Sequence, residues 1–103
     1  MRTVKIALPE HNDSFSRIVI KNVQYSIRFT YNDTFDYWTF GIYTPLREPI
    51  AEGIKIVPNS PLNAFERRPE MPKVVFGCES KLDRIGRYDF KNGDAEFYYI
   101  EED

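Results

Sequence analysis

The chain has 103 residues, of which 42% are hydrophobic and 29% charged, and its formal net charge is −2. This length predicts one domain, and the apolar content excludes an intrinsically disordered chain. The nearly neutral charge gives no reason to expect nucleic acid or a membrane as a partner. No apolar run approaches the roughly 20 residues of a membrane span, and the N-terminus lacks signal-peptide features, so we expect a cytoplasmic protein where it is made.

Alternating apolar side chains predict three strands in the first third of the chain. The first is expected at 3–8, ended by Pro9, and the second at 15–20. The clearest alternation covers 23–31, where every second residue is apolar, so one face of this strand should be buried and the other exposed. The Lys21-Asn22 pair predicts a hairpin between the second and third strands, because Asn tolerates a positive φ.

Six aromatic residues, including the only tryptophan, lie close together between Thr30 and Tyr43. The polar residues 32–36 predict a turn, followed by a strand that begins near Tyr37. In that strand Trp38 and every second residue after it should face the core, opposite the apolar face of 23–31. Tyr37 and Tyr43 are then left on the other face, where they could form a surface.

The second half of the chain is predicted to hold three strands, one short helix and one long loop. Ser60 suits an N-cap and Pro61 the first helical position, which predicts a helix near residues 60–67. The polar, weakly patterned residues 79–94 are typical of a loop that carries function. The remaining strands are expected at 50–56, 73–78 and 95–100.

These elements together predict a mainly β fold for residues 1–103, which we expect to form a single β-rich domain. About seven strands joined by short links indicate a small antiparallel β-sandwich or barrel with one short helix. Strand order is not encoded in the alternation, so the sequence leaves the choice between sandwich and barrel open.

Residues that could carry catalysis are few. Cys78 and His11 are the only cysteine and histidine, they lie far apart in the sequence, and together they cannot supply a usual metal-ligand set. Cys78 follows apolar residues, which is typical of a buried free thiol, and no internal disulfide can form. Acidic pairs such as Asp33 and Asp36 are interpreted as solvated turn residues. We therefore expect no enzyme activity, no cofactor and no metal.

Several landmarks follow one another in a distinctive order. Leu8-Pro9 closes the first strand, the third strand has the form V-x-Y-x-I-x-F-x-Y-N from Val23 to Asn32, and Trp38 belongs to the next. After these come Gly53, then Pro61, Leu62 and Phe65, and finally Phe97, Tyr98 and Tyr99. Over nearly the whole chain this order resembles the small baseplate plug proteins of contractile-tailed phages, the cyanophage baseplate plug family, which prophages often carry.

The resemblance implies a structural virion protein without catalytic activity. Such a protein would sit at the central hub of the tail baseplate, beneath the tail tube, and help to close the channel before contraction. Its partners would be the hub and spike proteins, with the end of the tape-measure protein as a further candidate. A position on the tail axis implies a homo-oligomer, with a trimer expected, because an axial component repeats around that axis.

A protein that works through contacts is expected to use exposed aromatic and arginine side chains. Edge strands offer a second route to partners, because they present unpaired backbone groups. The candidate interface residues are Tyr37, Tyr43, Phe65, Arg67 and Arg68, together with the loop 79–94.

Other functions stay open at this point. A small carbohydrate- or ligand-binding β-module would need Trp38 or several tyrosines exposed in a row. A small enzyme or nuclease inhibitor would need a poised nucleophile, base or metal set. A regulatory or host-interaction protein of a mobile element is the remaining alternative.

Overall fold

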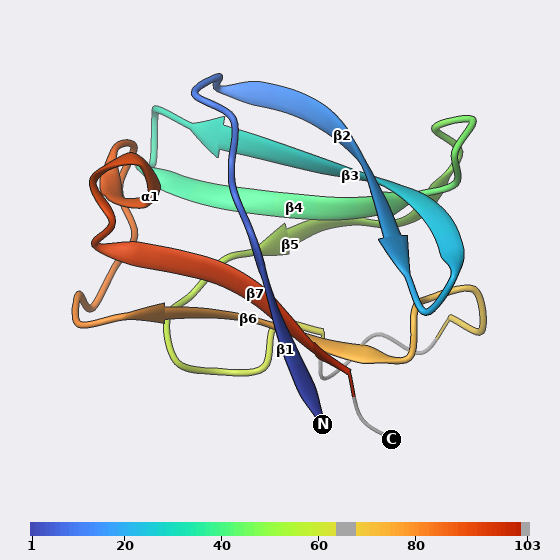
Figure 1. Cartoon of the computed structure of the whole chain (residues 1–103). Coiled ribbons are helices and arrows are strands. Elements are labelled where there is room, and N and C mark those ends of the chain that lie inside the picture. The colour runs from blue at the N-terminus through green and yellow to red at the C-terminus, as the bar shows by residue number, and fades with distance from the viewer. Residues whose placement is uncertain (64–67, 102–103) are drawn as a thin grey trace.

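The computed structural model describes residues 1–63 and 68–101. In this part of the chain seven strands form two antiparallel sheets that face each other, and one short helix precedes the last strand (Figure 1). The mainly β prediction is confirmed, and the two separate sheets make the fold a sandwich. In chain order the elements are β1 (Arg2–Ile6), β2 (Asp13–Ile20), β3 (Val23–Asn32), β4 (Tyr37–Tyr43), β5 (Pro49–Lys55), β6 (Val74–Ser80), α1 (Asp89–Asn92) and β7 (Ala95–Glu101).

The four-stranded sheet has the order β2-β3-β4-β5, and the three-stranded sheet has the order β1-β7-β6. Consecutive strands of the larger sheet are neighbours, as expected for strands joined by short links. The predicted hairpin between β2 and β3 is confirmed. Lys21 and Asn22 both have a positive φ, 51° and 66°, as a two-residue type I′ turn requires.

The core lies between the two sheets and is rich in aromatic rings. Phe29 and Phe40 of the larger sheet meet Phe97 of β7 with ring centroids 5.1 and 5.0 Å apart. Ile27 and Phe29, on the face of β3 predicted to be buried, are each 0% exposed. Fully burying a side chain of this size contributes about 1.5–3 kcal/mol, so these residues hold the sheets together.

Trp38 is buried as predicted, but its neighbours differ from those expected. Its side chain is 1% exposed and lies beside Tyr31, with ring centroids 5.3 Å apart. The two residues are paired on adjacent strands of one sheet. The prediction that Trp38 packs opposite the face of β3 was wrong, because β3 and β4 pair edge to edge and the opposite layer is the smaller sheet.

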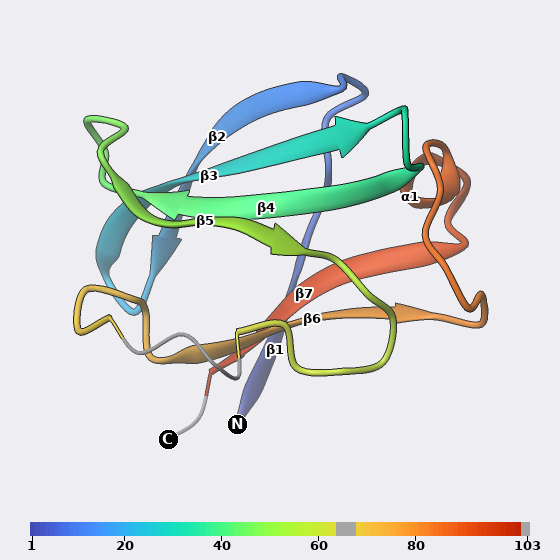
Figure 2. The same cartoon turned by 180° about the vertical axis from the view of Figure 1, so that it is seen from behind.

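The helix predicted near residues 60–67 is not supported where the structure describes it. The chain at 60–63 contains bends, and 64–67 lie outside the described residues. Long-range bonds replace local helix bonds here: Asn59 and Asn63 bond the backbone of β6, at Ser80, Val74 and Phe76. This link therefore runs beside β6 (Figure 2).

The one helix in the described part of the chain, α1, lies within the segment 79–94 that was predicted to be a loop. It has only four residues, so it leaves almost no periodic signal in the sequence. Gly93 ends it with a φ of 81°, the left-handed conformation that glycine adopts most easily at a helix C-terminus. The helix packs against β7 and Trp38, with the rings of Trp38 and Phe90 5.9 Å apart.

Candidate protein-interaction site

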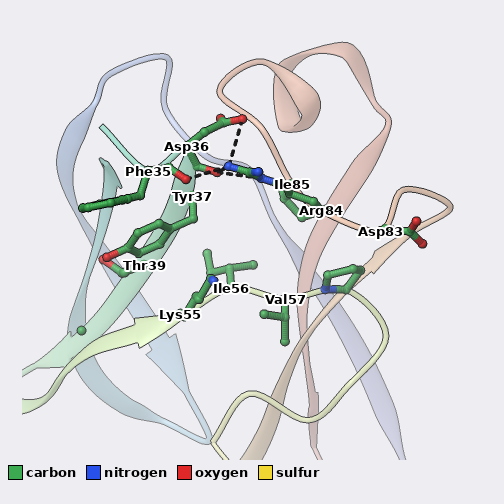
Figure 3. Close-up of a pocket in the computed structure, with 12 residues that line it drawn as sticks. Phe35, Asp36, Tyr37, Thr39, Lys55, Ile56, Val57, Asp83, Arg84 and Ile85 are labelled. Carbon is green, nitrogen blue, oxygen red and sulfur yellow. Dashed lines mark hydrogen bonds and ion pairs between the residues drawn. The ribbon is translucent and has the colours of Figure 1, made fainter. Parts of the chain in front are cut away.

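A groove of about 710 Å³ lies at one end of the larger sheet (Figure 3). Three segments that are distant in sequence form it: the β3–β4 turn with the start of β4, the end of β5 with the residues after it, and the loop before α1. The residues that define its character are Phe35, Tyr37, Lys55, Val57, Asp83 and Arg84.

The β3–β4 turn places an aromatic side chain at the rim of this groove. The side-chain oxygen of Asn32 accepts hydrogen bonds from the backbone N–H groups of Thr34 and Phe35, both at 3.1 Å. Asn residues commonly stabilise turns in this way. Asp36 follows with a φ of 54° and directs the chain into β4. The turn is thereby fixed while the side chain of Phe35 stays 69% exposed.

Arg84 joins the loop before α1 to this turn. Its guanidinium donates hydrogen bonds to the carbonyl oxygens of Phe35, at 2.7 Å, and Asp36, at 3.0 and 3.3 Å. The same group lies 3.4 Å from a carboxylate oxygen of Asp36. Hydrogen bonds from a charged donor to backbone carbonyls are stronger than neutral ones, so this side chain fixes the relative position of two groove walls.

The carboxylate of Asp36 also holds the neighbouring strand. The hydroxyl of Tyr31 donates a hydrogen bond to Asp36 Oδ1 over 2.5 Å. This bond, together with burial of the phenol and the negative charge of Asp36, raises the pKa of Tyr31 to about 12. Tyr31 therefore remains protonated, and keeps donating to Asp36, throughout the physiological range.

The groove combines aromatic, apolar and charged surface. Lys55 Nζ lies 5.0 Å from the centroid of the Tyr37 ring, within the range of a cation–π contact. Val57 is 37% exposed nearby. Aromatic residues with a cation and a polar rim are typical of protein interfaces and their most energetic contacts.

Trp38 and Arg87 support the loop behind the groove. The indole N–H of Trp38 donates a hydrogen bond to the carbonyl oxygen of Gly86 over 3.0 Å. The guanidinium of Arg87 lies 5.7 Å from the Trp38 ring and 5.1 Å from the Tyr88 ring. Because Trp38 is buried, it cannot line the exposed aromatic row that a carbohydrate-binding module would need with this residue.

The structure separates the interface residues predicted from sequence. Tyr37 lies in the groove, and the loop 79–94 contributes Arg84 to it. Arg68 instead lines a different hollow, beside Thr44 at the other end of β4. Phe65 and Arg67 lie outside the described residues.

The prediction that Tyr43 lies on an exposed face was wrong, because its side chain is only 5% exposed. Gly41, two residues earlier on the same face, leaves room for the ring: a Cβ atom there would come within 2.9 Å of Tyr43 Cε1. Phe15 covers the ring, with centroids 5.1 Å apart, and the Tyr43 hydroxyl donates a hydrogen bond to Glu52 over 2.9 Å.

Sequence reasoning missed the role of Phe35 and of Arg84. Phe35 lies inside a turn of otherwise polar residues, where a large apolar side chain has no core to enter. This position was the one signal in the sequence that Phe35 could be an exposed contact residue. Arg84 is one of several basic residues in the polar segment, and nothing in the sequence distinguishes the one that bonds the turn.

Catalytic chemistry finds little support in the described residues. Cys78 is 0% exposed, and burial raises the pKa of its thiol to about 11, so the thiolate nucleophile is disfavoured. Among residues 1–63 and 68–101, no three His, Cys, Asp or Glu side chains are grouped so that they could hold a metal ion. Nor does this part of the chain contain a helix long and apolar enough to cross a membrane.

Comparison with protein families gives one match that spans almost the whole chain. The family described as cyanophage baseplate Pam3 plug gp18 matches residues 1–102. A comparison with curated proteins gives no match. The family match confirms the resemblance seen in the order of strand landmarks, and a structural role in the phage tail baseplate follows from it. The chain belongs to the cyanophage baseplate plug family.

Proposed function

We propose that this protein helps to close the tail tube at the centre of the baseplate, through contacts with the hub and spike proteins and with the end of the tape-measure protein. The match to the baseplate plug family over residues 1–102 carries this proposal. The protein is made in the host cytoplasm and enters the virion when the tail assembles. A trimer around the tail axis fits this role, because an axial component of a closed ring repeats around its axis.

The groove at the end of the larger sheet is the surface that we assign to the hub protein. Phe35 is exposed there although it is a large apolar side chain, and Tyr37 and Lys55 lie next to it in the groove. The bonds from Arg84 hold the turn in place before any partner arrives. A pre-ordered surface loses less conformational entropy on binding, which favours a stable contact.

The test is binding of the purified chain to the purified hub protein of the same phage, followed by light scattering and titration. Phe35→Ala should weaken the complex by at least about tenfold, as expected when an aromatic anchor is truncated. Leu46→Ala is the matched control, because Leu46 is also a large exposed apolar residue, at 83%, and lies just after the opposite end of β4. That control should bind like the unchanged protein.

Two results would count against these assignments in different ways. If the unchanged chain forms no complex with the hub protein, the proposed function fails. If it binds but Phe35→Ala and Leu46→Ala bind equally well, the function stands and the groove is not the contact surface.

A further inference from the structure

The two sheets have four outer edges, and two of these are visibly blocked. Along β6 the link from β5 occupies the backbone: Asn59 N–H and Leu62 N–H donate to the carbonyl oxygens of Cys78 and Phe76, and the Asn63 side chain bonds both Val74 and Phe76. Along β5 the pairing with β4 shifts register twice, and Gly53 has a φ of 68°. Such irregularities and coverings prevent another strand from adding to an edge.

The other two edges, β1 and β2, differ in length and regularity. β1 has only five residues, and short edge strands are poor templates for pairing. β2 has eight residues that pair one to one with β3 without any shift, and it contains no proline and only one basic residue, Arg17. Among the described edges, β2 is therefore the long, regular one that is open to a further strand.

The pairing of β2 with β3 shows which of its backbone groups face outward. Tyr31 N–H donates a hydrogen bond to the carbonyl oxygen of Asn12 over 2.7 Å, which extends the ladder by one residue. In an antiparallel ladder the hydrogen-bonded residues alternate, so the even-numbered residues of β2 bond β3. The N–H and C=O groups of Phe15, Arg17 and Val19 then point to the open edge.

The side chains of these same residues lie on the outer face and form a distinct pattern. Val19 is 58% exposed, Phe15 is half-buried and Arg17 is exposed between them. The described part of the chain supplies no hydrogen-bond, ion-pair or ring partner for Arg17. The nearest acidic residue of the strand, Asp13, is already held by Arg28 through two hydrogen bonds of 2.6 and 2.7 Å.

We propose that the open edge of β2 binds an extended segment of the hub protein, which pairs as a fifth strand of the larger sheet. The segment carries an acidic side chain opposite Arg17 and apolar side chains opposite Phe15 and Val19. Main-chain hydrogen bonds give such a contact its affinity, and the alternating side chains give it specificity. This inference rests on the proposed function, because it names the second surface through which the plug meets the hub.

A second copy of this chain fits the same edge less well. Two β2 strands paired around Arg17 would place two guanidinium groups opposite each other, and like charges directly opposite are destabilising. Pairing around Phe15 would place Arg17 opposite Asp13. Arg28 already donates a hydrogen bond to each carboxylate oxygen of Asp13, so this carboxylate is not free to pair with Arg17. In both of these registers the charges of β2 disfavour a second copy and favour a different, acidic strand.

Four variants of the full chain test the edge, each titrated with the purified hub protein after circular dichroism has confirmed its fold. Val19→Pro removes an outward-facing N–H and leaves the ladder to β3 intact, since proline is tolerated on open strand edges. Arg17→Glu places a like charge opposite the proposed acid, whereas Arg17→Lys keeps the positive charge. Lys73→Glu is the matched control, an equal change of charge at an exposed residue outside β2, the groove and the loop 79–94.

The proposal predicts that Val19→Pro and Arg17→Glu each weaken hub binding by at least about tenfold, while Arg17→Lys and Lys73→Glu stay within about threefold of the unchanged chain. If all four variants bind the hub protein as tightly as the unchanged chain does, the edge assignment is overturned and the proposed function still stands. Absence of any complex with the unchanged chain would overturn both. Self-association that Arg17→Glu abolishes, without an effect on hub binding, would show that a second copy occupies the edge and would also overturn the proposal.

Discussion

The indole N–H of Trp38 and the carbonyl oxygen of Gly86 lie 3.0 Å apart and form a hydrogen bond between the two halves of the sandwich. Trp38 belongs to β4 of the larger sheet, and Gly86 belongs to the link between β6 and β7 of the smaller sheet. The only tryptophan of the chain thus fills the core and also fixes the loop that forms one wall of the groove.

Trp38→Phe keeps an aromatic ring in the core but removes this donor. The carbonyl of Gly86 loses its partner and a small cavity remains, so we expect a loss of about 1–3 kcal/mol in the free energy of unfolding. Amide hydrogen exchange should rise most in the residues 84–92. Exchange that rises evenly along the chain, with no excess in this loop, would contradict the role given to the bond.

Tyr31 should make the protein sensitive to high pH. Its pKa is about 12 in the folded protein against about 10 in an unfolded chain, so the folded state holds the phenolic proton more tightly. This stabilisation is complete below pH 10 and is lost as the pH rises towards 12. In urea unfolding at a series of pH values, Tyr31→Phe should therefore lose less stability than the unchanged protein between pH 10 and 12.

Tyr88→Phe serves as the control for that experiment, because Tyr88 is 60% exposed. It should follow the pH dependence of the unchanged protein. If Tyr31→Phe follows it as well, the short bond between Tyr31 and Asp36 does not hold the proton as described.

Gly41 and Gly77 are both buried strand glycines, but their substitution by alanine should have different effects. A Cβ atom at Gly41 would lie 3.0 Å from the backbone oxygen of Ala51 and 3.3 Å from the Cα of Glu52, so the strands themselves must separate. At Gly77 the close contacts are all with the outer end of the Tyr98 ring, a side chain that can turn away. We expect Gly41→Ala to cost about 1–3 kcal/mol and Gly77→Ala clearly less, measured by thermal unfolding.

Ser14 offers a substitution that should not destabilise the protein. Its hydroxyl oxygen is buried, and within the described residues it has no hydrogen-bond partner. A buried polar group without a partner costs about 1–3 kcal/mol, so Ser14→Ala should leave the melting temperature unchanged or raise it. Ser80→Ala is the contrast, because the Ser80 hydroxyl donates to the carbonyl oxygen of Asp94 over 2.6 Å, and its loss should lower the melting temperature.

The strands were predictable from sequence because each carries its own signal. The alternation in β3 identified Ile27 and Phe29 as core residues, and the Lys21-Asn22 pair identified the hairpin. The failures share a physical cause, which is long-range contact. Tyr43 is buried by Phe15, which is distant in the sequence, and Asn63 bonds β6 in place of a local helix.

The groove was predictable only in part for the same reason. Tyr37 and the loop 79–94 were candidates from composition, but the sequence does not show that Arg84 reaches the carbonyl groups of the β3–β4 turn. Equally, alternation does not give strand order, so the open edge of β2 could be recognised only from the pairing of the strands.

The most direct measurement of the central claim is a cryo-electron microscopy map of intact, uncontracted tails of the phage that encodes this chain. The account predicts density for the seven-stranded sandwich on the tail axis, at the baseplate end of the tube, in three copies that contact the hub. Tails that lack this density, or that carry it away from the axis, would contradict the assignment of the chain as the component that closes the tube.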